Sequence, residues 1–118
     1  MELHVKGKNL EVSDAIRSYA ERKLSKLDKQ VSKLARVEVE LAVEKNPSIS
    51  DNQVAEATVW LKGHTLRARE ATRDMKASID ELTEKLLRQV KDERDRKARK
   101  RKIDKHALDA ADASALDS

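Results

Sequence analysis

The spacing of apolar residues switches between two regular patterns along the chain, and this switch predicts the order of its elements. Strict alternation of apolar and polar residues is typical of strands with one buried face. Apolar residues that recur every three or four positions are typical of amphipathic helices. Strands are predicted at 2–6, 36–44, 53–62 and 65–70. Helices are predicted at 14–34 and 75–102, so the order is β-α-β-β-β-α.

Turn-forming and capping residues stand between these segments. Gly7 ends the first alternating run, and Ser13 precedes the first helical pattern as an N-cap. The segment 46–52 is rich in turn formers and holds the only proline. Gly63-His64 is expected to form a tight hairpin turn, because glycine tolerates a positive φ.

The predicted elements combine into an α+β fold. A helix joins the first two strands, so these are expected to be parallel through a right-handed crossover, while the later strands form a meander. Both helices then cover the apolar face of one four-stranded sheet, and Trp60 points to the other face. We expect one domain over 1–95, followed over 96–118 by a basic helix end and an acidic tail that is disordered from Asp109.

The composition argues against several classes of function. There is no cysteine, and no apolar run approaches the roughly 20 residues of a membrane span. The N-terminus lacks the pattern of a signal peptide, so a cytoplasmic protein without a membrane partner is expected. His4, His64 and His106 have no metal-ligand spacing, and two glycines cannot form a phosphate loop. We therefore expect no enzyme activity, metal, cofactor or small-molecule substrate.

Positive charge is concentrated late in the chain. Residues 71–102 carry 12 Lys/Arg against 7 Asp/Glu, a net charge of +5. Residues 103–118 carry 1 against 4, a net charge of −3. Such a concentration favours a polyanionic partner, although a well-solvated helix is also charged.

Basic residues also recur at helical spacing on the predicted outer faces of both helices. On the first helix the spacing is four, three and four; on the second it is three, and two further lysines flank these sets. The candidate RNA-binding residues are Arg22, Lys23, Lys26, Lys29, Lys33, Lys76, Lys85, Arg88 and Lys91. Two helices on one sheet face would merge these stripes into one basic surface suited to backbone phosphates.

Two features qualify this interpretation. Glu21 and Glu84 interrupt the stripes, so the charge pattern alone leaves a merely solubilising surface open. Tyr19 and Trp60 are the only aromatic residues, which disfavours base stacking. Recognition of RNA shape and phosphates fits the sequence better than base reading.

Three segments along residues 1–95 carry recognisable motifs. They are MELHVKGKNLEVSDAIRSYAERKLSKLDK, VEVELAVEK and LRAREATRDMKASIDELTEKLLRQVKDERDR. Together they resemble the ribosome hibernation-promoting factor family, which includes the ribosome-associated inhibitor. The first segment is similar to the family's first strand and helix, and the second to its second strand. The third is the most specific and is close to the family's last strand and helix.

The resemblance implies a fold similar to double-stranded-RNA-binding domains. It also implies binding to 16S-type rRNA of the small ribosomal subunit, in the channel used by mRNA and tRNAs, and silencing of translation by occlusion. The family's basic helix residues would correspond to Lys23, Lys26 and Lys29, and to Lys85 and Arg88.

Two departures from the family pattern stand out. Lys76 occupies a position where members usually carry Tyr. Long members have a C-terminal dimerisation domain that this chain lacks, so it is expected to be a short member or the N-terminal part of a long one. A general double-stranded-RNA-binding module and a protein-interaction domain remain the alternatives, with an enzyme last.

Overall fold

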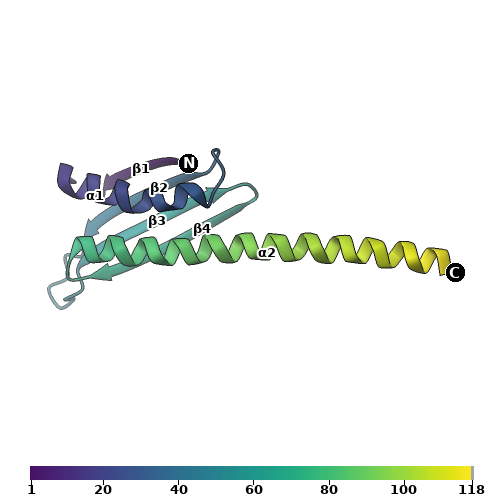
Figure 1. Ribbon diagram of the computed structural model, residues 1–118. Helices are drawn as coiled ribbons and strands as arrows, with labels where there is room; N and C mark the ends of the chain where they lie inside the picture. The colour runs from purple at the N-terminus through teal and green to yellow at the C-terminus, as the bar shows by residue number, and fades with distance from the viewer. Residues whose placement is uncertain (118) are drawn as a thin grey trace.

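The computed structural model describes the backbone of residues 1–117 and the side-chain environments of residues 1–99. The strands are β1 (Glu2–Gly7), β2 (Arg36–Val43), β3 (Gln53–Leu61) and β4 (His64–Thr72). The helices are α1 (Asp14–Leu24), the short 3₁₀ helix η1 (Ser25–Lys29) and α2 (Met75–Asp117). The predicted element order and α+β class are confirmed (Figure 1).

The four strands form one mixed sheet in the order β1-β2-β3-β4. β1 and β2 are parallel, with Val5 opposite Val39, and the other neighbours are antiparallel. Both α1 and α2 lie on the same face of this sheet, as the sequence predicted (Figure 1). The turn between β3 and β4 consists of Lys62 and Gly63, one residue earlier than expected, with Gly63 at φ 74°.

The core lies between the sheet and the two helices and is almost wholly aliphatic. Alternate strand residues point into it, so the predicted period of two is confirmed. The buried strand residues that form this core are Val5, Val37, Val39, Leu41, Ala55, Ala57, Val59 and Ala68. The helical residues that meet them include Leu24, Leu27, Ile79, Leu82 and Leu86, all with no exposed surface.

The first helix is shorter than its apolar pattern predicted. α1 ends at Leu24, and Leu27 is buried from η1, while Leu34 lies in the following loop with 95% of its surface exposed. A 3₁₀ helix has about three residues per turn, so the step from Leu24 to Leu27 keeps both on the core side. The chain then turns back to start β2, so beyond Gln30 the pattern no longer marks a helix: Val31 still packs against the core, but Leu34 does not.

The second helix is longer than its apolar stripe. Among the residues whose side chains are described, Val90 is the last buried one of this helix, yet α2 continues as one helix to Asp117. The sequence led us to expect disorder from Asp109, but the alanines of this segment have high helix propensity. The division of the chain near residue 95 stays a prediction. No helix among the described residues is sufficiently long and apolar to cross a membrane.

A buried serine links the start of α2 to the sheet by hydrogen bonds. Ser78 has no exposed surface; its Oγ donates to the Gln53 carbonyl at 2.6 Å and accepts from the Thr72 amide at 3.0 Å. Thr83, also buried, donates only to the Ile79 carbonyl of its own helix, at 2.8 Å. The Ser78 hydroxyl therefore joins α2 to the sheet, whereas the Thr83 hydroxyl bonds only within α2.

Replacement of Ser78 by alanine is expected to lower the free energy of unfolding by about 1–3 kcal/mol, because the part-buried Thr72 amide and Gln53 carbonyl both lose a partner. Urea unfolding measures this loss. Thr83→Val is the matched control and should cost less than about 1 kcal/mol, since the Ile79 carbonyl keeps its helical amide. Equal losses in both variants would contradict the proposed role of Ser78.

Candidate nucleic-acid interface

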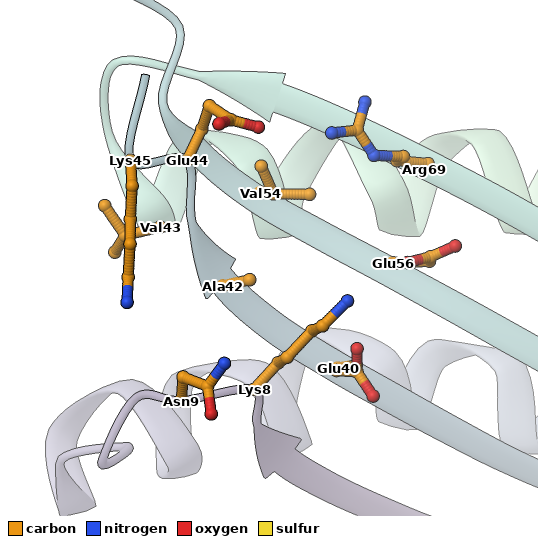
Figure 2. Close-up of a pocket in the computed structure, with 10 residues that line it drawn as sticks. All are labelled: Lys8, Asn9, Glu40, Ala42, Val43, Glu44, Lys45, Val54, Glu56 and Arg69. Carbon is orange, nitrogen blue, oxygen red and sulfur yellow. The ribbon is translucent and has the colours of Figure 1, made fainter. Parts of the chain in front are cut away.

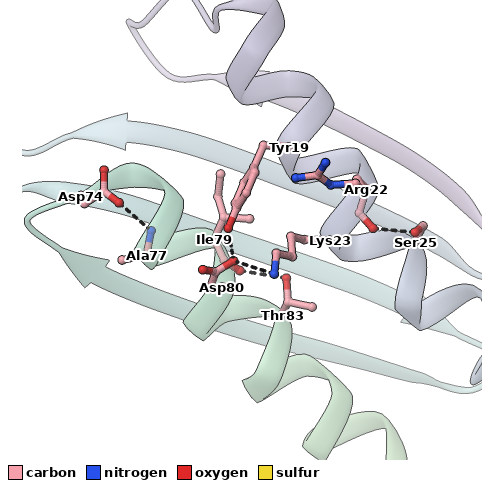
Figure 3. Close-up of polar contacts among 9 residues, drawn as sticks. All are labelled: Tyr19, Arg22, Lys23, Ser25, Asp74, Ala77, Ile79, Asp80 and Thr83. Carbon is pink, nitrogen blue, oxygen red and sulfur yellow. Dashed lines mark hydrogen bonds and ion pairs between the residues drawn. The ribbon is translucent and has the colours of Figure 1, made fainter.

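A tyrosine and an aspartate join the two helices on the layer that faces away from the sheet. The Tyr19 hydroxyl of α1 donates to Asp80 Oδ1 of α2 at 2.6 Å (Figure 3). Lys23 Nζ lies 3.5 Å from the same oxygen. The hydrogen bond to Asp80 raises the pKa of Tyr19 above its ordinary value, so the hydroxyl stays protonated and remains a donor. This contact joins α1 to α2 across the helical layer.

Three cations surround the Tyr19 ring. Arg22 Cζ lies 5.4 Å from the ring centroid, Lys23 Nζ 5.6 Å and Lys76 Nζ 5.4 Å. Each lies within the range of a cation–π attraction. Arg22 and Lys23 come from α1 and Lys76 from the first turn of α2, so the cluster depends on the packing of the helices. We call Tyr19, Arg22, Lys23 and Lys76 the tyrosine cluster.

The tyrosine cluster has a net positive charge. Among the described residues, Asp80 is the only carboxylate within ion-pair distance of a cation of this cluster, and the cation it pairs with is Lys23. Arg22 and Lys76 are exposed, and Lys23 is half-buried. An approaching anion would therefore meet two solvated cations on one surface, with Lys23 behind them. Such an arrangement suits a phosphate group.

The remaining predicted residues are spread more widely. Lys26 and Lys29 are exposed on η1, while Lys33 lies in the loop before β2 and is not on a helix. Arg88 and Lys91 are exposed on α2, further along from the tyrosine cluster.

Lys85 departs from the expected single surface. Its Nζ pairs with Glu70 Oε1 of β4 at 3.4 Å, so it lies on the flank of α2 next to β4. Asp80, which contacts α1, marks the other flank. The merging of both helical stripes is thus seen at the tyrosine cluster but does not extend to Lys85.

Tyr19 and Asp80 were not among the predicted site residues. The signal for Tyr19 was present, because Arg22 and Lys23 follow it at three and four positions and so share its side of a helix. Nothing in the sequence pairs Asp80 with Tyr19, since 61 positions separate them. That contact follows from the helix packing.

The opposite face of the sheet is charged but largely compensated. Lys6 pairs with Glu38 and lies 3.6 Å from Glu40. Lys6 holds the pKa of Glu38 below its ordinary value, and Glu38 raises the pKa of Lys6. Trp60 is on this face, as predicted, with Arg36 Cζ 5.3 Å from its ring centroid. Lys6 on this face is thus compensated by carboxylates, whereas no carboxylate lies within ion-pair distance of Arg22 or Lys76 among the described residues.

A cavity of about 370 Å³ opens at one end of that face (Figure 2). Its charged lining is balanced, with three cations and three carboxylates. They are Lys8, Lys45, Arg69, Glu40, Glu44 and Glu56. Balanced charge gives no preference for an anion, so the cavity is a weaker candidate than the tyrosine cluster. Among the residues that the structure describes, no three His, Cys, Asp or Glu side chains are grouped to hold a metal.

Comparison with known proteins places this fold in a family. The family model described as sigma 54 modulation protein / S30EA ribosomal protein matches residues 3–98. A ribosome hibernation promotion factor of Picosynechococcus sp. is 38% identical over 92 residues, which make up 77% of this chain and 48% of that protein. The chain thus spans about half the length of that relative.

Two further proteins are matched over almost their whole length. The ribosome hibernation promoting factor of Salmonella typhimurium is 35% identical over 96 residues, 81% of this chain and 96% of that protein. The crystal structure of the Thermus thermophilus Protein Y N-terminal domain matches with a TM-score of 0.65 at 35% identity, covering 77% of this chain and 97% of that one. The chain therefore belongs to the sigma 54 modulation protein / S30EA ribosomal protein family, the hibernation-factor family that its motifs resemble.

Proposed function

We propose that this protein binds the small ribosomal subunit in the channel used by mRNA and tRNAs and keeps ribosomes inactive. The observation that carries the proposal is the tyrosine cluster, where Arg22, Lys23 and Lys76 from two helices surround one ring. Relatives of this chain are named ribosome hibernation promotion factors, which supports the same role.

The chemistry of the helical layer favours contact with 16S-type rRNA through phosphates. Exposed cations form charge-assisted hydrogen bonds with phosphate oxygens. The Tyr19 ring is already occupied by three cations, and Trp60 lies on the opposite face. Neither ring is therefore placed for stacking against a base that meets the helical layer. The proposed interface recognises the shape of the RNA and the positions of its phosphates.

Silencing in this proposal requires no catalysis. A domain that fills the channel excludes mRNA and tRNA by occupying their space, so its only chemical task is binding. Lys26, Lys29, Arg88 and Lys91 would add phosphate contacts around the tyrosine cluster, and Lys33 and Lys85 would contribute at its margins. The proposed location is the cytoplasm, where ribosomes work.

Co-sedimentation with purified ribosomal subunits at low and high salt tests this proposal. We expect the protein to pellet with the small subunit at low salt and to be released as salt rises, because phosphate contacts displace counterions. An excess of mRNA with initiator tRNA should compete for the site. Absence from the small subunit at low salt would refute the proposal.

A free RNA duplex is the informative competitor in the same assay. Equal affinity for the duplex and for the small subunit would favour a general double-stranded-RNA-binding module. If glutamate at Lys26, Lys29, Lys85 and Arg88 left ribosome association unchanged, the charges would be merely solubilising. That result would favour a protein-interaction domain.

A further inference from the structure

α2 extends well past the sheet that anchors it. Strands β3 and β4 have nine residues each, which gives each a length of roughly 30 Å at 3.3 Å per residue. α2 has 43 residues, or roughly 65 Å at 1.5 Å per residue. Figure 1 shows the C-terminal part of α2 running beyond the end of the sheet. The longest dimension of the molecule, 70 Å, follows from this projection.

The last described contacts between α2 and the domain lie where the projection begins. Arg94 Nη1 donates to Gln30 Oε1 at 2.7 Å, and Lys97 Nζ donates to the Lys62 carbonyl at 3.2 Å. These contacts hold α2 against Gln30, the residue that follows η1, and against the β3–β4 turn. Arg96 and Arg99, by contrast, are exposed. The basic segment 94–102, with seven Lys/Arg and one Asp, therefore starts on the domain and leaves it.

The segment 94–102 has no apolar side to its helix. Between Val90 and Ile103 the only hydrophobic residue is Ala98. At about 100° per residue, Arg94, Arg96, Lys97 and Arg99 fall on all sides of the helix. A helix that lies on a membrane surface needs an apolar face, which is missing here. Positive charge on all sides suits phosphates that approach from more than one direction, as RNA strands around a channel do.

Acidic residues one turn earlier compensate only part of this positive charge. Asp92, Glu93 and Asp95 stand four positions before Arg96, Lys97 and Arg99, a spacing that stabilises an isolated helix. Further along the run, basic residues follow one another at the same spacing, which disfavours the helix by repulsion. An anionic partner would remove this repulsion. The family model matches residues 3–98, so the last four residues of the run, 99–102, lie beyond the shared domain.

We propose that the segment 94–102 is a second RNA-binding element, separate from the tyrosine cluster, which contacts RNA phosphates beyond the edge of the domain and whose helix is stabilised when it binds. This inference rests on the proposed function, because the small ribosomal subunit is the RNA to which the segment would be presented.

The test compares the full chain with an Arg96→Gln/Arg99→Gln variant. Both side chains are exposed and make no described hydrogen bond or ion pair, so the fold should be unaffected. Binding to purified small subunits is measured from about 50 to 200 mM salt. We expect the affinity of the variant at low salt to fall about 10-fold and the slope of log affinity against log salt to become shallower by about 1.5–2, because two cations no longer reach phosphates. Lys8→Gln/Lys45→Gln, which removes equal charge at the cavity, should leave the slope unchanged.

Hydrogen exchange gives the second measurement. Amides of 94–102 should exchange more slowly, by about 10-fold or more, when the unaltered chain binds the small subunit. If the unaltered chain binds but the slope is the same in the Arg96/Arg99 variant and exchange in 94–102 is unchanged, this inference is overturned and the proposed function stands. If the unaltered chain does not bind the small subunit, both fall. Binding of the segment to anionic phospholipid vesicles with no effect on subunit binding would also overturn it.

Discussion

Glutamine in place of Arg22, Lys23 and Lys76 together is expected to weaken binding to the small ribosomal subunit by about 100-fold at low salt. Each cation of the tyrosine cluster would contribute about 1 kcal/mol through a charge-assisted hydrogen bond to phosphate, and about 1.4 kcal/mol corresponds to a factor of ten. The slope of log affinity against log salt should fall by about 2–3, since each of the three cations displaces about one counterion. Co-sedimentation or fluorescence anisotropy over a salt series measures both quantities.

The matched control removes three cations from the other face of the molecule. Lys8, Lys45 and Arg69 line the cavity at the sheet, where carboxylates balance them. Their replacement by glutamine lowers the net charge equally and should change affinity by less than about threefold. If both triple variants were weakened equally, long-range charge alone would explain binding, and the tyrosine cluster would have no special part. Thermal unfolding of each variant checks that the fold is intact, because Lys23 also pairs with Asp80.

The second large effect concerns stability and uses two leucines from one apolar pattern. Leu27→Ala is expected to lower the free energy of unfolding by about 2–5 kcal/mol, since Leu27 is fully buried and its truncation leaves a cavity. Leu34→Ala should cost less than about 0.5 kcal/mol, because Leu34 is 95% exposed. Urea unfolding of both variants provides the measurement.

These two variants test whether α1 ends at Leu24, as in the structure, or continues to residue 34, as the spacing alone predicted. If 14–34 were one amphipathic helix, both leucines would lie on its buried side and both variants would be destabilised. Comparable losses would therefore contradict the end of α1 at Leu24 and the 3₁₀ turn that follows. A core without phenylalanine has few large side chains to close a cavity, which places Leu27→Ala toward the upper part of its range.

Local pattern predicted most of the fold, because strands and helices with one buried face repeat their apolar residues at a fixed period. β2 is the clearest case, since Val37, Val39 and Leu41 alternate with glutamates and are all buried. The same reasoning failed at Leu34, where the spacing continued after the helix had ended. Period alone does not record where a chain must turn to enter the next strand.

The candidate site was predicted only as far as each helix could be considered by itself. Arg22 and Lys23 each lie on the side of α1 that carries Tyr19, since they follow it at three and four positions, and both approach its ring in the structure. The approach of Lys76 to the same ring, and the turn of Lys85 toward Glu70, depend on how α2 rotates against α1 and β4. That rotation is set by the packing of Ile79, Leu82 and Leu86 against the sheet. It is a property of the assembled core, which no single segment specifies.

The two aromatic residues lie on opposite faces, and this separates two spectroscopic signals. Trp60, the only tryptophan, is on the sheet face beside Arg36, whereas Tyr19 is in the helical layer. Emission excited selectively from Trp60 therefore reports the integrity of the sheet. RNA bound to the helical layer, as proposed, would leave the surroundings of Trp60 unchanged. Unfolding of the free chain can thus be followed through Trp60 without a label, separately from events at the helical layer.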